Sequence, residues 1–183
     1  MTRKNISVGI YIKSETERNL AKHFMNCEKK LSLFPDSSRF LTEFPVGLGK
    51  ISELFPSNEE NLARMYGGLK SKKIDLIGAT KMSADWGIGR SDDAQQALIR
   101  TKTTRPKRFI DNVASDYVWV FEIKGTLDHK AIGQVQTYDT LLYHDLDSYY
   151  RRQLKVKKGI ICGATDRLLE LTCTRHGIEV FVV

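Results

Sequence analysis

The sequence predicts an α/β domain in which a central mixed β-sheet is flanked by helices. Three observations support this prediction. An amphipathic helical pattern leads the chain, residues 117–125 form a strand that is apolar on both faces at its start, and helices and strands then alternate to residue 183. The 183 residues are 41% apolar and 28% charged, a balance that excludes a fibrous or mostly disordered chain. One domain spanning residues 1–183 is expected.

The N-terminal elements follow from capping and turn signals. Residues 14–34 read as an amphipathic helix, with Ser14 as N-cap and Glu17 three residues later. Prolines and glycines between residues 35 and 58 indicate loops around a short strand at 40–47. Two further elements are expected before the middle of the chain: a short helix at 57–68 that ends at a Gly-Gly pair, and a strand at 72–80.

The middle of the chain is polar and irregular, and regular elements resume at residue 117. Residues 80–116 contain a helical stretch at 91–102 and a second short helix at 106–115, where a proline stands near the first helical position. The remaining elements are a strand at 117–125, a long helix at 127–153, a strand at 159–165, a helix at 166–177 and a final strand at 178–183.

Charge and cysteine content bound the kind of protein. The chain has 29 Lys and Arg against 22 Asp and Glu, so its net charge of +7 favours a polyanionic partner. Three widely spaced cysteines predict a reducing, cytoplasmic compartment rather than a disulfide framework. No apolar run approaches the ~20 residues of a membrane span, so a soluble, intracellular protein without membrane attachment is expected.

The strand at 117–125 carries two charged residues on one face. Alternation places Glu122 and Lys124 side by side, on the face of Val118 and Val120, where the strand leaves its buried part. A carboxylate and an ammonium are costly there unless they are paired or bind something. A partly exposed salt pair at a strand end is the alternative interpretation.

Other polar residues give this pair a context. Asp75 lies among apolar residues of the strand at 72–80, where a lone carboxylate has no evident structural reason. Gln134 and Tyr138 stand four residues apart in the long helix and therefore share one face. The joint pattern is far more specific than any of its parts.

The segment "VWVFEIKGTLDHKAIGQVQTY" resembles the core of the PD-(D/E)xK phosphodiesterase superfamily. It is most similar to the branch with a QxxxY helix, which includes RecB-type and lambda-type exonuclease domains. The resemblance covers roughly residues 70–79 and 117–183. It implies a restriction-endonuclease-like core and a divalent-metal-dependent nuclease that hydrolyses DNA phosphodiester bonds.

The resemblance also implies a set of catalytic residues. In that family a strand Asp, the Glu of ExK and the carbonyl between Glu and Lys bind the metal, while the Lys positions or deprotonates the attacking water. The Gln and Tyr line the site and contact the DNA. Carried over, the metal ligands are Asp75, Glu122 and the Ile123 carbonyl, and the other site residues are Lys124, Gln134 and Tyr138. Two carboxylates suit Mg²⁺ or Mn²⁺, which are hard cations that neutralise phosphate charge and acidify bound water.

The identity of the metal-binding Asp stays open. Asp75 lies 47 residues before Glu122, whereas the family joins these strands by a shorter hairpin, so residues 80–116 would be a basic insertion. The other candidate is Asp111, only 11 residues upstream of Glu122. We favour Asp75, because its surroundings have the pattern of a core strand. One N-terminal acid is a possible further ligand: Glu17, Glu43, Glu59 or Glu60.

Basic residues cluster in three places along the chain. Those expected to contact nucleic-acid phosphates are Lys70, Lys72, Lys73, Arg100, Lys102, Arg105, Lys107 and Arg108. A further cluster stands beside Tyr149 and Tyr150: Arg151, Arg152, Lys155, Lys157 and Lys158. The alternative for each cluster is solvated surface charge.

Two other functions compete with a DNA-cleaving enzyme of general specificity. The first is a structure-selective, Holliday-junction-type resolvase, which would act as a homodimer. The second is a non-catalytic nucleic-acid-binding module on the same fold. The complete Asp, Glu and Lys set argues against the second, because a binding module need not keep both carboxylates near its phosphates.

Overall fold

The computed structural model describes residues 14–34, 38–47, 72–83 and 105–183, and it has the expected α/β architecture with a five-stranded mixed sheet flanked by helices. Its elements are α1 (Glu15–Asn26), α2 (Glu28–Leu33), β1 (Arg39–Pro45), β2 (Lys73–Ala79), α5 (Arg105–Asn112), β3 (Tyr117–Thr126), α6 (His129–His144), a π-helical turn η2 (Asp145–Tyr149), β4 (Lys155–Ala164), α7 (Arg167–Arg175) and β5 (Ile178–Val182).

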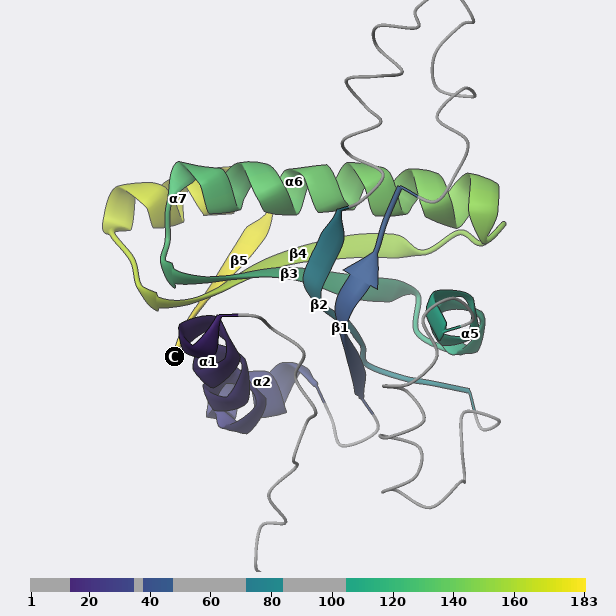
Figure 1. Cartoon of the computed structure of the whole chain (residues 1–183), viewed down its shortest axis with the longest axis horizontal. Coiled ribbons are helices and arrows are strands. Elements are labelled where there is room, and N and C mark those ends of the chain that lie inside the picture. Colours follow the sequence, from purple (N-terminus) through teal and green to yellow (C-terminus); the bar gives the residue numbers. More distant parts are fainter. Residues whose placement is uncertain (1–13, 35–37, 48–71, 84–104) are drawn as a thin grey trace, which may run out of the picture.

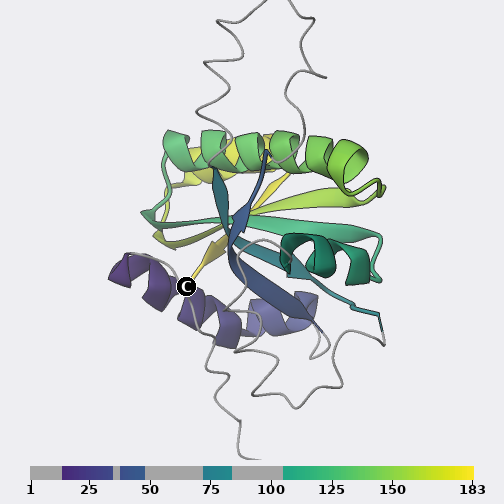
Figure 2. The same cartoon turned by 45° about the vertical axis from the view of Figure 1, so that its right-hand side comes forward.

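The strands lie in the sheet in chain order. β1 pairs with β2 and β2 with β3 in antiparallel fashion, whereas β3, β4 and β5 are parallel. The parallel strands are joined through α6 and α7, which lie together on one face of the sheet (Figure 1). Helices α1 and α2 cover the other face, so the sheet is the middle of three layers (Figure 2).

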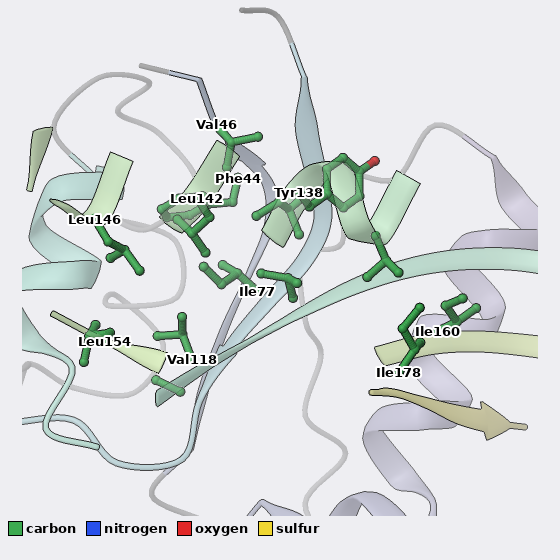
Figure 3. Packing of buried hydrophobic residues seen from close by; sticks show 14 of the residues in the cluster. Phe44, Val46, Ile77, Val118, Tyr138, Leu142, Leu146, Leu154, Ile160 and Ile178 are labelled. Atoms are coloured by element: carbon green, nitrogen blue, oxygen red, sulfur yellow. The ribbon is translucent and has the colours of Figure 1, made fainter. Parts of the chain in front are cut away.

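Two hydrophobic clusters hold these layers together. The larger lies between the sheet and α5, α6 and η2; in Figure 3 its Ile77 lies near Leu142, and Ile160 lies farther along the sheet, beside Ile178. The smaller lies under α1 and α2 and is rich in aromatic rings. Strand β3 supplies both clusters alternately, with Val120 in the first and Phe121 in the second. The prediction that this strand is covered on both faces is confirmed.

The predicted helix over residues 14–34 is divided at Cys27. Ser14 caps α1 as expected, since its hydroxyl accepts the Glu17 N–H at 3.4 Å. Cys27 has an extended backbone, with φ −78° and ψ 152°, and its Sγ accepts the Lys30 N–H at 3.3 Å as the cap of α2. One continuous amphipathic pattern in the sequence therefore corresponds to two helices, because both pack their apolar sides on the same sheet.

The long helix is shorter than expected and β4 is longer. Helix α6 ends at His144, and a π-helical turn follows in which the buried Asp145 accepts the Gly47 N–H at 2.8 Å. Strand β4 begins at Lys155, four residues before its apolar part, because this lysine-rich start pairs with β3 from Tyr117 onward. Its exposed lysines hide the strand signal that a periodicity argument uses.

The predicted helices at 57–68 and 91–102 lie outside the described residues. The short helix expected at 106–115 is present as α5. Its Phe109 and Ile110 are fully buried in the larger cluster, and Met82 forms a β-bridge with Val113, so this end of the expected insertion is integrated into the core. Within the described parts of the chain, no helix is both long and apolar enough to cross a membrane.

Candidate active site

Asp75 and Glu122 lie opposite each other on neighbouring strands. The antiparallel register that pairs Leu76 with Phe121 places Asp75 across from Glu122. The Ile123 backbone N–H donates to Asp75 Oδ2 at 2.9 Å. A side-chain carboxylate thus accepts an N–H at the edge of the regular β2–β3 ladder, which pairs only Leu76, Ile77 and Gly78 of β2.

A backbone irregularity on β1 accompanies this arrangement. Glu43 is opposite Asp75 in the β1–β2 register and has φ 54°, a left-handed conformation that is uncommon for a residue with a side chain. At this point the alternation of side chains between the two faces of the sheet shifts by one residue in both strands, while the pairing register of β1 with β2 is unchanged. Leu41 and Ile77 face the larger cluster before this point, and Phe44 and Ile74 face it after. Asp75 therefore stands where the regular alternation of β2 is interrupted.

Glu122 is buried and poorly satisfied. Only 1% of it is exposed, and neither carboxylate oxygen has a hydrogen bond of good geometry. Lys124 Nζ lies 2.9 Å from Glu122 Oε1 as an ion pair. As predicted, the two side chains are neighbours on one face of the strand. Because Glu122 is buried, however, the alternative of a partly exposed salt pair does not describe it.

Burial and mutual repulsion disfavour two charges in this place. Burial raises the pKa of Asp75 to about 8, the nearby Glu122 charge adds to the rise, and the Ile123 N–H opposes it. Without another cation, the protein therefore holds Asp75 protonated at neutral pH. A divalent cation would reverse this preference, because it replaces the lost solvation of both carboxylates.

Helix α6 adds two polar groups. The pKa of Tyr138 is raised by burial and further by the charges of Glu122 and Asp75, so its hydroxyl remains a neutral hydrogen-bond donor. In Figure 3 this hydroxyl points away from the aliphatic side chains labelled around it. The Gln134 side-chain oxygen is buried and has no hydrogen-bond partner. Both residues come from one face of α6, as their spacing predicts.

Helix α1 brings an additional acid to the site. Glu17 Oε1 lies 3.8 Å from Lys124 Nζ, and its charge acts on Asp75 as well. The sequence offered Glu17 only as one of four N-terminal acids. Of the others, Glu43 forms an ion pair with Lys73 at 2.9 Å, and Glu59 and Glu60 lie outside the described residues. The described segments contain no group of three or more His, Cys, Asp or Glu residues arranged to hold a metal ion.

Lys124 is held as a cation. Burial by itself lowers the pKa of Lys124, but attraction to Glu122, Glu17 and Asp75 outweighs burial and raises it above its usual range. The Lys124 side chain is 24% exposed, so its ammonium group lies between the buried carboxylates and the solvent. The site therefore combines two buried carboxylates, a fixed positive charge and two neutral polar groups.

The other candidate residues lie elsewhere. Asp111 is on α5, exposed, and 3.6 Å from Lys107 in an ion pair of adjacent helix turns. Lys72 is exposed, while Lys73 is paired with Glu43. Of the remaining predicted phosphate contacts, Arg105 and Arg108 belong to α5, whereas Lys70, Arg100 and Lys102 lie outside the described residues.

Comparison with known proteins adds no relative. The chain matches no protein-family model, no curated protein and no solved structure.

Proposed function

We propose that the chain is a divalent-metal-dependent nuclease with a restriction-endonuclease-like core that hydrolyses DNA phosphodiester bonds. The observation that carries the proposal is the pairing of Asp75 and Glu122 across neighbouring strands, with Lys124 Nζ 2.9 Å from the glutamate. The order of elements supports it too. Helices lead into an antiparallel run of three strands, and a crossover helix follows the ExK strand into a parallel neighbour.

The donor set fits Mg²⁺ or Mn²⁺. Both Glu122 oxygens are buried without good hydrogen bonds, and Asp75 is destabilised by its neighbour's charge. Such groups gain most from a hard cation that accepts oxygen ligands and keeps several waters. When bound, the cation would neutralise phosphate charge and acidify a water molecule. Asp75 and Glu122 would hold it.

The remaining residues take roles suited to their protonation. Lys124 is an ammonium that faces the edge of the site, and it would stabilise the charge that develops on the phosphate. Tyr138 and Gln134 are neutral, so they would orient phosphate oxygens by hydrogen bonds without adding charge. Glu17 would hold the Lys124 ammonium in place from α1.

Cleavage assays with isosteric variants test the proposal. Labelled linear, nicked, single-stranded and four-way-junction DNA, with an RNA control, are incubated with Mg²⁺ or Mn²⁺ or with EDTA. We expect metal-dependent cleavage that Glu122→Gln and Asp75→Asn each reduce by about 100-fold or more. Asp111→Asn is the matched control, because it removes an equal charge from an exposed surface pair, and it should retain full activity.

Three outcomes would contradict the proposal. Cleavage that persists in EDTA would exclude the metal mechanism, and the absence of metal-dependent cleavage on every substrate would leave only a binding module. A fully active Asp75→Asn with an inactive Asp111→Asn would transfer the metal site to α5. Cleavage confined to four-way junctions would narrow the function to a resolvase.

A further inference from the structure

The Lys124 ammonium lies among carboxylates from three elements. Its Nζ is 2.9 Å from Oε1 of Glu122 and 3.8 Å from Oε1 of Glu17. The charge of Asp75 attracts it as well. These acids come from β3, α1 and β2, which are distant in the sequence. A positive charge beside a buried carboxylate replaces part of the solvation that the carboxylate has lost, which is also what a bound metal ion does.

The pairing of Lys124 with Glu122 is incomplete. The ammonium lies near Oε1 of Glu122, whereas Oε2 is buried and has no hydrogen-bond partner. The single charge of the lysine is also shared, because Glu17 attracts it from the other side. The lysine therefore compensates the buried glutamate only in part. A divalent cation, which has two charges and accepts several oxygen ligands, would compensate it more fully.

The Lys124 side chain has room to leave Glu122. The two residues are two positions apart on one face of β3, about 7 Å along the strand, so their side chains must lean toward each other to meet. Gly125 and Thr126, which follow in the strand, are exposed. Because the stem of a lysine is flexible, the ammonium can move from the buried carboxylate toward solvent without a change in the backbone.

Glu17 offers the ammonium a second partner nearer to solvent. The Glu17 side chain is 25% exposed, against 1% for Glu122. It belongs to the first turn of α1, which lies beside the carboxyl end of β3, where a Cβ added at Gly125 would be 3.8 Å from the Thr16 methyl group (Figure 1). A movement of about 1 Å would bring the Lys124 and Glu17 charges to the usual distance of an ion pair.

Charge balance favours this movement when a divalent cation binds. The charges of two ionised carboxylates and of a divalent cation cancel, so Glu122 then has no need of the ammonium. A lysine that stayed beside Glu122 would also be repelled by the cation at short range. Held by Glu17 instead, the ammonium is a surplus positive charge at the exposed side of the site, where a phosphate can approach it.

We propose that the Lys124 ammonium takes the place of the cation beside Glu122 while no divalent cation is bound, and that it moves to Glu17 when one binds. This inference rests on the proposed function for the cation site and adds how that site is controlled. The lysine lowers the affinity of the free protein for metal, and it becomes available to a substrate phosphate once metal has bound. Because the freed ammonium attracts phosphate, metal and substrate strengthen each other's binding.

Lysine acetylation, read by mass spectrometry, tests this movement in the unaltered protein. The protein is treated briefly with acetic anhydride in EDTA or in saturating Mn²⁺, and modification is followed residue by residue. We expect Lys124 to be protected in EDTA and to react roughly three to ten times faster in Mn²⁺. Lys158 is the internal control, because it is 20% exposed, against 24% for Lys124, and lies 3.2 Å from Asp139 in a similar pair. Its reactivity should not change.

The metal affinity of a Lys124 variant gives a second, independent measurement. Lys124→Met removes the ammonium and keeps an unbranched side chain, and Lys158→Met is its matched control. Thermal unfolding in EDTA verifies that both variants fold, and electron paramagnetic resonance measures Mn²⁺ binding. We expect Lys124→Met to bind Mn²⁺ about tenfold more tightly than the parent and Lys158→Met to bind it equally. The gain should persist at about 0.5 M salt, where repulsion between separated charges is screened.

Glu17→Gln tests the second position of the ammonium. In Mn²⁺ the Lys124 of this variant should be acetylated faster than that of the parent, because no carboxylate on α1 receives it. In EDTA it should remain protected by Glu122. Equal reactivity of Lys124 in the variant and the parent in Mn²⁺ would contradict the movement to Glu17.

The outcomes separate this inference from the proposed function. If Mn²⁺ binds while Lys124 stays protected, or if Lys124→Met binds Mn²⁺ no more tightly than the parent, the exchange is overturned and the nuclease stands. If Lys124→Met does not fold, the acetylation result decides alone. Release of Lys124 by Mn²⁺ in a chain that cleaves no DNA would uphold the exchange and remove the nuclease. A parent protein that binds no divalent cation would overturn both.

Discussion

Replacing Asp75 by Asn should stabilise the fold while it abolishes metal-dependent activity. The carboxyl group has a pKa of 3.8 in the unfolded chain, and burial with the Glu122 charge raises this pKa to about 8 in the fold. Between these values the folded chain holds a proton that the unfolded chain has released. The free energy of unfolding therefore falls as pH rises from about 4 to 8, and the Asn variant has no such loss.

The size of the effect follows from the two pKa values. At pH 7, about three pH units above 3.8, each unit costs the wild-type fold ~1.4 kcal/mol, or roughly 4 kcal/mol in all. An amide keeps the shape of the protonated carboxyl group and still accepts the Ile123 N–H. We expect about 2–4 kcal/mol to be recovered, which for a chain of this size raises Tm by about 5–10 °C.

Thermal unfolding by circular dichroism in EDTA, from pH 4 to pH 8, measures this difference. The Tm values of variant and wild type should coincide near pH 4 and separate progressively above it. Asp139→Asn is the control, since Asp139 forms a partly exposed pair with Lys158, and surface pairs contribute only ~0–1 kcal/mol. Millimolar Mg²⁺ should raise the Tm of the wild type and leave that of Asp75→Asn unchanged.

A Tm difference that does not grow with pH would contradict a raised pKa of Asp75 in the fold. So would an Asp75→Asn protein that is less stable than the wild type at pH 8 in EDTA. Either result would mean that the carboxylate is ionised and satisfied within the fold, in which case it has no need of a cation.

Three further predictions concern the sheet and helix α5. Gly159→Ala should lower the free energy of unfolding in urea by about 1–3 kcal/mol, because its Cβ would lie 2.5 Å from the Phe121 ring. Gly133→Ala, which has open space around it, should be neutral or stabilising. A Gly133→Ala protein that is less stable than Gly159→Ala would contradict this packing. Glu43→Asn should preserve stability and Glu43→Val should lower it by about 1–2 kcal/mol, since of the two new residues only Asn tolerates φ 54°. Equal urea midpoints for the two variants would count against backbone strain at residue 43. Arg152→Met should increase hydrogen exchange in α5, because the Arg152 guanidinium donates to the Ile110 carbonyl of this helix at 2.7 Å. Unchanged exchange would show that this bond does not hold the helix.

Much of the architecture was predictable because the signals are local. Alternation along residues 117–124 places Glu122 and Lys124 on one face of a buried strand, and a 3.6-residue period places Gln134 and Tyr138 together. These patterns depend only on the geometry of one element. They specify which side chains share a face, but they contain no information on which other strand lies opposite.

The parts that escaped prediction depend on pairing between distant segments. Local patterns around Asp75 and Asp111 are similar, and only the β2–β3 register brings one of these residues next to Glu122. Glu17 reaches Lys124 because α1 packs across β3, which no spacing in the sequence indicates. The left-handed Glu43 is equally hidden, because nothing in its own residue type favours that conformation.

The irregularity at Glu43 and the burial of Asp75 belong to one arrangement. If β1 and β2 alternated regularly, Ile74 and Phe44 would leave the larger cluster, although both are fully or almost fully buried in it. The slip keeps them inside and takes Asp75 out of the regular alternation, toward the Ile123 N–H. The fold thus retains its apolar contacts on both sides of a carboxylate that burial disfavours. A strained backbone and a destabilised acid therefore lie at one place between two well-packed clusters, and both features are typical of functional sites.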